Sequence, residues 1–154
     1  MAVAAHVSRV AKDYAPYGYS IMETATGTVY TEATGTVDKT ELLLINDDAD
    51  IYIESITILA ITAVTADNTH YLTMMCGSFA SGGTDAELHF TPFTTEITGG
   101  GTLAVGTQYA QTVLFPVVAK GRQLVFKVSK AATGGGGEAD NREIGISVRY
   151  RRKA

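Results

Sequence analysis

The sequence is poor in the features that mark several common classes of protein. It has a single cysteine, so no disulfide can form within the chain, and it has no tryptophan and only three prolines. Its longest apolar stretch, ESITILAITAVTADN, is interrupted by Ser, Thr and Asp and is shorter than the roughly 18 residues that a membrane span needs. Charged residues make up 18% of the 154 residues and hydrophobic residues 45%. We therefore expect one soluble globular domain without a membrane partner.

The N-terminus also lacks the pattern of a secretory signal, which needs a basic start and a run of about 7–15 apolar residues. The sequence MAVAAHVSRVAKDY instead mixes Ala and Val with His, Ser, Arg and Lys. This composition predicts a protein that is made and kept in a cytoplasm. The one cysteine, Cys76, follows the apolar run YLTMM and has no basic neighbour that would lower the pKa of its thiol, so we interpret it as a core residue.

Positive charge is missing from half of the chain. Between Lys39 and Lys120 there is no Lys or Arg, while the same stretch carries nine acidic residues. From Lys120 onward nine basic residues stand against three acidic ones. This separation suggests that one folded copy presents two faces of opposite sign, a pattern that suits assembly between copies and that high salt should weaken.

The residues that are abundant favour β-structure. Thr, Val and Ile are frequent, all three are β-branched, and helical periodicity is confined to Val3, Val7 and Val10. Turn-forming sequences recur about every ten residues, among them NDDAD, GSFASGG, ITGGG, AKGR and TGGGG. These breaks predict nine strands: 19–23, 29–32, 41–46, 51–64, 70–75, 87–93, 111–118, 123–129 and 143–151. This spacing is typical of a sandwich or barrel.

Two of the predicted strands alternate between apolar and polar residues, as expected for strands with one buried face. In QLVFKVS the residues Leu124, Phe126 and Val128 lie on one side, and in EIGISVRY the corresponding residues are apolar at 144, 146 and 148. We therefore predict an all-β, jelly-roll-like antiparallel β-sandwich that spans residues 39–154.

Residues 1–38 precede this domain and contain a repeat, because ATGTVYTE at 25–32 is followed at once by ATGTVDKT at 33–40. One interpretation is a hairpin or a pair of short extended segments that bend at Gly27 and Gly35. The other is an extended N-terminal arm over residues 1–38. Its tyrosines would then contact a partner, since Tyr is enriched at interfaces; the candidates are Tyr14, Tyr17, Tyr19 and Tyr30.

No group of side chains in the sequence matches a known catalytic or metal-binding pattern. The acidic run from Asp47 to Asp50 lacks the Gly and Glu that a calcium loop places at its sixth and twelfth positions, so we interpret it as an acidic turn. The three histidines form no local pair of the kind that announces zinc. The glycine clusters fit neither a P-loop nor a dinucleotide fingerprint. We therefore expect no enzyme activity, no cofactor and no metal.

The C-terminus carries one basic cluster, which includes Arg149, Arg151 and Arg152. It is interpreted either as a solvated tail, as a salt-sensitive contact with the acidic middle of an adjacent copy, or as a contact with nucleic acid. Nucleic-acid binding usually needs a larger basic footprint than a chain of net charge −4 offers, so no nucleic-acid partner is expected. The three arginines are therefore candidate contacts with a protein partner.

The ending FPVVAKGRQLVFKVSKAATGGGGEADNREIGISVRYRRK consists of an apolar strand, a Lys-Gly turn, an alternating strand, a glycine-rich loop and a final alternating strand. This order resembles the last strands of the jelly-roll decoration, or cement, proteins of tailed-bacteriophage heads. The resemblance implies a virion structural protein on the capsid exterior that is made in the host cytoplasm. It also implies that the protein self-associates, as a homotrimer, and stabilises the head through arm-mediated contacts with the major capsid protein.

A second hypothesis remains open at this point, which is a carbohydrate-binding or receptor-binding jelly-roll module, for example of a phage tail or fibre. Its sugar platform would consist of aromatic residues, namely Tyr52, Tyr71, Phe90 and Phe93. The lack of tryptophan and of a calcium site weakens this hypothesis.

Overall fold

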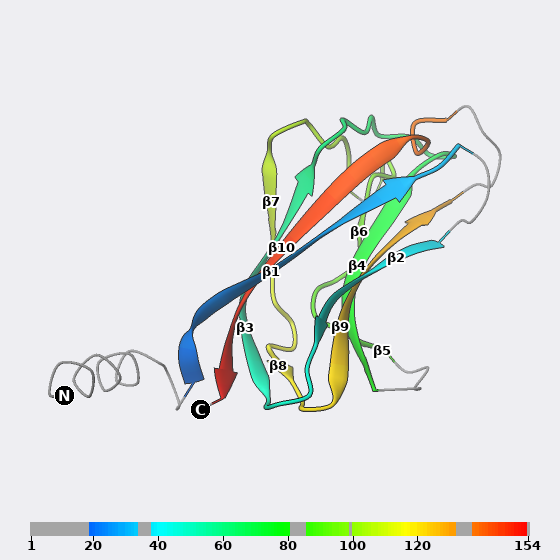
Figure 1. Cartoon of the computed structure of the whole chain (residues 1–154). Coiled ribbons are helices and arrows are strands. Elements are labelled where there is room, and N and C mark those ends of the chain that lie inside the picture. Colours follow the sequence, from blue (N-terminus) through cyan, green and yellow to red (C-terminus); the bar gives the residue numbers. More distant parts are fainter. Residues whose placement is uncertain (1–18, 34–37, 81–85, 99, 132–136, 154) are drawn as a thin grey trace, which may run out of the picture.

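The structure is a computed structural model that describes residues 19–33, 38–80, 86–98, 100–131 and 137–153. Within these ranges the chain forms ten β-strands and no helix, so none of the described residues belongs to a helix that could cross a membrane (Figure 1). The strands are β1 (Tyr19–Thr31), β2 (Asp38–Ile45), β3 (Ile51–Ala60), β4 (Leu72–Ala80), β5 (Ala86–Leu88), β6 (Phe93–Thr94), β7 (Gln108–Gln111), β8 (Val117–Val118), β9 (Arg122–Lys130) and β10 (Arg142–Lys153).

The strands form two antiparallel sheets that face each other (Figure 1). Sheet A has the order β1-β10-β3-β7, with β8 also paired to β3, and sheet B has the order β2-β9-β4-β5, with β6 also paired to β4. If β5 and β6 are counted as one interrupted strand, and β7 and β8 as another, the strands pair from the outside of the sequence inward. β1 pairs with β10, β2 with β9, β3 with β7 and β8, and β4 with β5 and β6. This is a long hairpin rolled into two sheets, which confirms the predicted jelly roll.

The core lies between the sheets and comes from the alternating strands, as predicted. Leu124, Phe126 and Val128 of β9 are fully buried, and they face the buried Ile144 and Val148 of β10 across the sandwich. Because the side-chain period of a strand is two, the residues between them point to the outer face of each sheet. The buried Cys76 on β4 belongs to the same core, which confirms its interpretation, and burial raises the pKa of its thiol to about 12.

The N-terminal arm predicted over residues 1–38 is contradicted for residues 19–31. Residues 1–18, with Tyr14 and Tyr17, lie outside the described residues, but residues 19–31 form β1, an edge strand of sheet A that pairs with β10 along its length. Its side chains Ala25 and Val29 are part of the core. The sandwich therefore begins at residue 19 and not at residue 39, because β10 needs a neighbour on this side to cover its buried residues.

The bend predicted at Gly27 is absent. Gly27 lies inside β1 and faces the interior, where an added Cβ would overlap the side chain of Leu43 and lie 2.8 Å from Glu41 Cγ. Glycine is needed here for the close approach of β2 to β1, and not for a turn. The two copies of the repeat consequently have different structures, since the first belongs to β1 and the second leads into β2; Gly35 lies outside the described residues.

Several predicted strands and one predicted turn differ from the structure, among them the strands predicted at 19–23 and 29–32, which are one continuous strand, β1. The segment 77–80 of the GSFASGG turn is a continuation of β4, because Gly77 and Ser78 are paired on both sides, with β5 and with β9. The strand predicted to Val64 ends at Ala60, and the strands predicted at 87–93 and 111–118 are each split into two short pieces. Between the pieces, tertiary hydrogen bonds replace the ladder, as described below.

A buried ion pair lies at one end of the sandwich, at the end of β9. Lys130, at the end of β9, is 3% exposed, and its Nζ lies 2.6 Å from Asp140 Oδ1. The same Nζ donates hydrogen bonds to the backbone oxygens of Glu32 (2.6 Å) and Ala33 (3.3 Å). The other carboxylate oxygen of Asp140 accepts the N–H of Gly137 at 3.1 Å. One ammonium group thus joins the segment after β1 to the segment before β10.

Candidate docking surfaces

Three exposed apolar side chains follow one another closely in the sequence, two between β7 and β8 and one at the start of β8. Leu114, Phe115 and Val117 project into solvent, and Phe115 is 56% exposed. We call these three residues the apolar loop. Large apolar side chains that cluster on the surface mark interaction sites more often than isolated ones do.

Hydrogen bonds from two other segments hold the backbone of the apolar loop. The N–H of Leu114 donates to the carbonyl of His89 at 2.9 Å, and the carbonyl of Pro116 accepts the N–H of Ile53 at 2.7 Å. The carbonyl of Phe115 accepts a hydrogen bond from His89 Nδ1 at 2.6 Å. The backbone of three successive residues is thus held by hydrogen bonds, while the side chains remain in solvent. The backbone therefore has little conformational freedom to lose on binding.

His89 itself is fully buried between β5 and β6. A carbonyl can only accept, so Nδ1 carries the proton and Nε2 does not; Nε2 has no hydrogen-bond partner among the described residues. Burial lowers the pKa of His89 below its usual value of 6.5, and the hydrogen bond to Phe115 opposes this shift in part. Glu87 raises and Arg122 lowers the same pKa to a smaller extent. The neutral imidazole is therefore the form that supports the loop.

We expect the stability of the protein to fall below about pH 6.5 because of His89. The unfolded chain binds a proton at its ordinary pKa, while the folded chain excludes that proton until a lower pH, so acid favours unfolding by up to about 1.4 kcal/mol per pH unit. Urea denaturation at pH 7.5 and 5.5 measures this loss. In the His89→Gln variant the loss between the two pH values should be smaller by about 1 kcal/mol. An identical loss in both proteins would contradict this role of His89.

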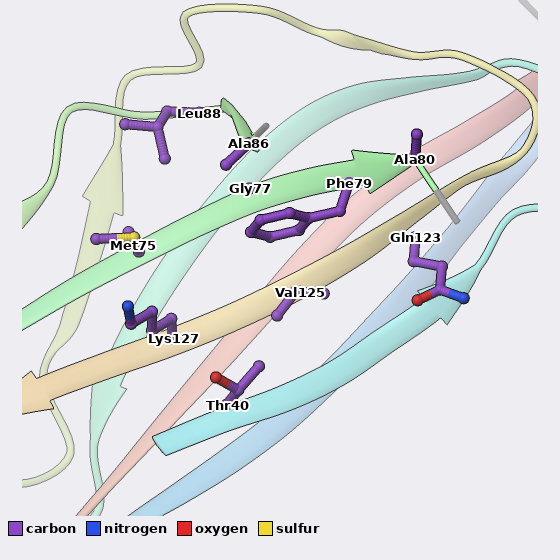
Figure 2. A pocket seen from close by; sticks show the side chains of 10 residues that line it. All are labelled: Thr40, Met75, Gly77, Phe79, Ala80, Ala86, Leu88, Gln123, Val125 and Lys127. Carbon is purple, nitrogen blue, oxygen red and sulfur yellow. The ribbon is translucent and has the colours of Figure 1, made fainter. Parts of the chain in front are cut away.

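The outer face of sheet B is a second apolar surface, and it is hollowed (Figure 2). Met75 and Phe79 of β4, Val125 of β9 and Leu88 of β5 line a cavity of about 270 Å³, and its wall also includes the polar residues Thr40, Gln123 and Lys127. Leu42 of the neighbouring β2 lies opposite Val125 and is 46% exposed. We call the five apolar residues, Met75, Phe79, Leu88, Val125 and Leu42, the apolar face.

The outer face of sheet A is mixed in character. Thr24, Thr26 and Thr28 of β1 are exposed there beside Ser147 and Arg149 of β10. The same face has a hollow of about 210 Å³, which is lined in part by Leu59 and Ile61. Both sheets therefore offer some apolar surface, and the larger hollow is the one on sheet B.

Two of the four tyrosines predicted to contact a partner lie within the part of the chain that the structure describes. Tyr19 and Tyr30 lie at opposite ends of β1, opposite Lys153 and Glu143 of β10. The side chain of Tyr30 is exposed, and its hydroxyl donates to Asn141 Oδ1 at 3.0 Å. A role in partner contact remains a prediction for all four tyrosines, including Tyr14 and Tyr17 outside the described residues.

The two faces of opposite charge predicted from the sequence are wrong. Antiparallel β10 lies between β1 and β3, so its arginines meet acidic residues of the same copy. Arg151 Nε lies 2.9 Å from Glu54 Oε1, and Arg152 Nε lies 2.9 Å from Glu23 Oε2. Three further ion pairs join basic residues of the last third of the chain to acids, namely Lys127–Asp38, Lys130–Asp140 and Arg142–Glu138. Arg149 is exposed on β10, and a role in partner contact remains a prediction for Arg149, Arg151 and Arg152.

The aromatic residues proposed as a sugar platform are not brought together on one surface. Phe90 is buried in the core, and Phe93 packs against Tyr109 with ring centroids 6.1 Å apart. Tyr52 is on sheet A, whereas Tyr71 precedes β4 of sheet B.

The acidic run at 47–50 is a turn between β2 and β3, as interpreted, and Asp50 Oδ1 accepts the N–H of Lys120 at 2.9 Å. Among the described residues, no three His, Cys, Asp or Glu side chains gather as a metal site would require.

The apolar loop was not predicted, because its residues lie in the run TVLFPVV, which was interpreted as part of a strand at 111–118. One signal could have identified it. Pro116 has no N–H to donate, and proline is rare inside central strands, so its presence argued against a continuous strand.

Comparison with solved structures supports the fold. A chain of the cyanophage Pam1 capsid asymmetric unit matches with a TM-score of 0.50 and 14% sequence identity, over 88% of this chain and 87% of that chain. A chain of the acidic stable capsid of Helicobacter pylori bacteriophage KHP30 matches with a TM-score of 0.48 and 11% identity, over 88% and 91%. VP2 of an infectious bursal disease virus subviral particle gives a TM-score of 0.40 and 13% identity, over 87% and 37%.

Comparison of sequences gives no relative, because no protein-family model and no curated protein matches the chain. At 14% identity the match to the cyanophage chain shows a shared fold and nothing further about activity. Together with the strand order of the two sheets, it shows that the protein is an all-β jelly roll of the type found in a phage capsid.

Proposed function

We propose that the protein is a virion structural protein, and more specifically a decoration or cement protein of a phage head. It would be made in the host cytoplasm, associate with other copies of itself as a homotrimer, and bind the major capsid protein on the capsid exterior. Two findings support this proposal: the jelly-roll fold is shared with a chain of a phage capsid over nearly the whole length of both chains, and the molecule carries exposed apolar surface on a rigid frame.

The apolar loop is the observation that carries the proposal. A protein that stabilises a shell needs contact area that is available before binding, and many modest contacts repeated by symmetry add up to strong attachment. Phe115 offers a large aromatic side chain of the kind that dominates binding energy when it fills a pocket on a partner. Its backbone carbonyl accepts a hydrogen bond from His89 at 2.6 Å, so the point from which the side chain projects is fixed. We therefore assign the shell contact to this loop.

The positions of the nucleophilic and basic groups also fit a structural role better than a catalytic one. Cys76 is buried, and burial raises the pKa of its thiol to about 12, so it does not supply a thiolate near neutral pH. His89 has no access to solvent in the folded protein. Neither group is placed to meet a substrate.

Replacing Phe115 by Asp tests the proposal. The carboxylate would have to be desolvated against the shell, and we expect affinity for shells assembled from the major capsid protein to fall at least tenfold, which corresponds to about 1.4 kcal/mol. Cosedimentation of the purified protein with empty shells measures this change. Because the side chain is in solvent, the free energy of unfolding should stay within about 0.5 kcal/mol of the wild type.

Val105→Asp is the matched control. Val105 is an exposed apolar residue on the segment that leads into β7, outside the apolar loop. This variant should bind shells as the wild type does. Equal binding by the Phe115 variant, or an equal loss in both variants, would contradict the assignment of the shell contact to the loop.

A further inference from the structure

His89 joins the apolar loop to sheet B through both its backbone and its side chain. Its N–H donates to the carbonyl of Cys76 on β4 at 2.9 Å, which anchors it to the sheet. Its carbonyl accepts the N–H of Leu114 at 2.9 Å, and its Nδ1 donates to the carbonyl of Phe115 at 2.6 Å. Because Leu114 and Phe115 are 47% and 56% exposed, packing contributes little to holding them. The position of this part of the loop therefore depends on His89.

The site of the imidazole suits the neutral ring only. A second proton would be carried by Nε2, which is buried and has no hydrogen-bond partner among the described residues. The charged groups that act on the ring are Glu87 of β5 and Arg122 of β9, and their effects on its pKa oppose each other. β4 meets His89 through the backbone of Cys76, whose thiol has a pKa of about 12 and is uncharged in acid. An imidazolium would thus be a buried charge with an unsatisfied donor.

The loop can separate from His89 without breaking a strand pair. His89 lies between β5 and β6, and Leu114 and Phe115 lie between β7 and β8, so none of the three belongs to a strand. Leu114 and Phe115 are also not members of the hydrophobic core. On its other side the loop stays attached to sheet A, where Ile53 donates its N–H to the carbonyl of Pro116 at 2.7 Å. Turning the imidazole into water would therefore free one side of the loop and leave both sheets paired.

We propose that protonation of His89 releases the apolar loop, so that the loop is held at neutral pH and opens in acid before the sandwich unfolds. The inference rests on the proposed function, because it adds regulation to the loop that is assigned to the shell contact. In the open loop the imidazole takes up a proton at its ordinary pKa of 6.5, whereas the closed loop excludes that proton, so acid favours the open form. An open loop loses the fixed backbone that prepares it for binding, and acid should therefore weaken the shell contact.

Amide hydrogen exchange of the full-length protein, measured by NMR at pH 7.5 and 5.5, tests the inference without a shell. After correction for the intrinsic exchange rate, the opening constant at the Leu114 amide should rise about tenfold from the higher to the lower pH, since only the open form takes up the proton over this range. At both pH values it should exceed the opening constant of the β9 amides, which report unfolding of the whole sandwich, by at least about tenfold. Equal opening constants at Leu114 and in β9, or no response of Leu114 to pH, would overturn the inference.

Two substitutions of His89 and one control assign the response to this side chain. His89→Asn keeps an N–H donor near the position of Nδ1 and cannot become charged, so the pH response at Leu114 should disappear. His89→Gln replaces it if that chain fails to fold. His70→Asn is the control, because His70 precedes β4 and its Nδ1 lies 3.8 Å from Asp67 Oδ1, outside the apolar loop. This variant should keep the tenfold response, and a response that survives in the His89 variants would contradict the assignment.

Cosedimentation with shells between pH 7.5 and 4.5 tests the consequence for attachment. The wild type should leave the shells at a higher pH than the His89→Asn variant does, and circular dichroism should still show β-sheet at the pH of release. Because both proteins meet the same shells, acid effects on the shell itself cancel in this comparison. Release of both proteins at the same pH would overturn the inference. Binding by neither protein at pH 7.5 would contradict the proposed function instead, and the exchange experiment would then decide whether His89 controls the loop.

Discussion

Removing residues 1–38 should abolish folding, whereas removing residues 2–18 should leave the sandwich intact. The larger deletion takes away β1, whose Ala25 and Val29 belong to the core and whose backbone pairs with β10. The inner residues of β10 would then lie at an unprotected edge, and the core would lose one of its walls. The deletion also removes the backbone oxygens of Glu32 and Ala33 that accept hydrogen bonds from Lys130.

Circular dichroism together with urea denaturation measures this difference. The chain without residues 2–18 should show β-sheet and a cooperative transition near that of the full chain, and the chain without residues 1–38 should show no cooperative transition. A shortened chain starting at residue 39 that unfolds cooperatively would contradict the place of β1 in the sandwich. It would favour the longer arm expected from the sequence.

Replacing Lys130 by Met should destabilise the protein by about 3–5 kcal/mol. The change leaves the Asp140 carboxylate, which is 7% exposed, without the ammonium that lies 2.6 Å from its Oδ1, and removing one partner of a buried ion pair costs far more than the pair contributes. Two backbone oxygens also lose their donor. Urea denaturation at pH 7 measures the loss.

Lys127→Met is the matched control for this prediction. Lys127 is on the same strand, β9, but its Nζ pairs with the half-exposed Asp38 at 2.9 Å on the outer face of sheet B. Ion pairs at the surface contribute only about 0–1 kcal/mol, so this variant should unfold close to the wild type. A similar loss of unfolding free energy in the two variants would show that burial does not make the Lys130–Asp140 pair more important than the surface pair. In a double variant, Asp140→Asn should recover part of the loss caused by Lys130→Met.

The sequence predicts the parts of the fold that repeat locally. Leu124, Phe126 and Val128 alternate with polar residues, and this alternation alone determines which face of β9 is buried. The turns at 46–50 and 119–122 were equally predictable, because the first is rich in Asp and Asn and the second contains Gly121, which has a φ of 87°.

Features that depend on distant pairing were not predictable. Gly77 and Ser78 look like turn residues, but β5 and β9 pair with them on both sides and hold them in a strand. The arginines of β10 look like a free basic cluster, but the order of sheet A places Glu54 of β3 next to Arg151. In each case a residue that is far away in the sequence determines the local structure or the ion pairing, and the periodicity of the sequence does not reveal which residue that is.

The candidate docking surfaces also depend on contacts between segments that are distant in the sequence. The exposed Phe115 could not be distinguished from a buried strand residue, because the hydrogen bonds that turn its backbone outward come from His89 and Ile53. The apolar face of sheet B follows from the register of β2, β9 and β4, which the sequence does not specify.

The central claim is that the protein is a structural part of a virion, and its amount in purified particles tests this most directly. Quantitative mass spectrometry of particles of the virus that encodes the chain would measure its ratio to the major capsid protein. A cement protein occupies symmetry-related positions, so we predict a fixed ratio of small whole numbers that survives further purification of the particles. Absence of the chain from the particles, or a ratio that varies between preparations, would contradict the account.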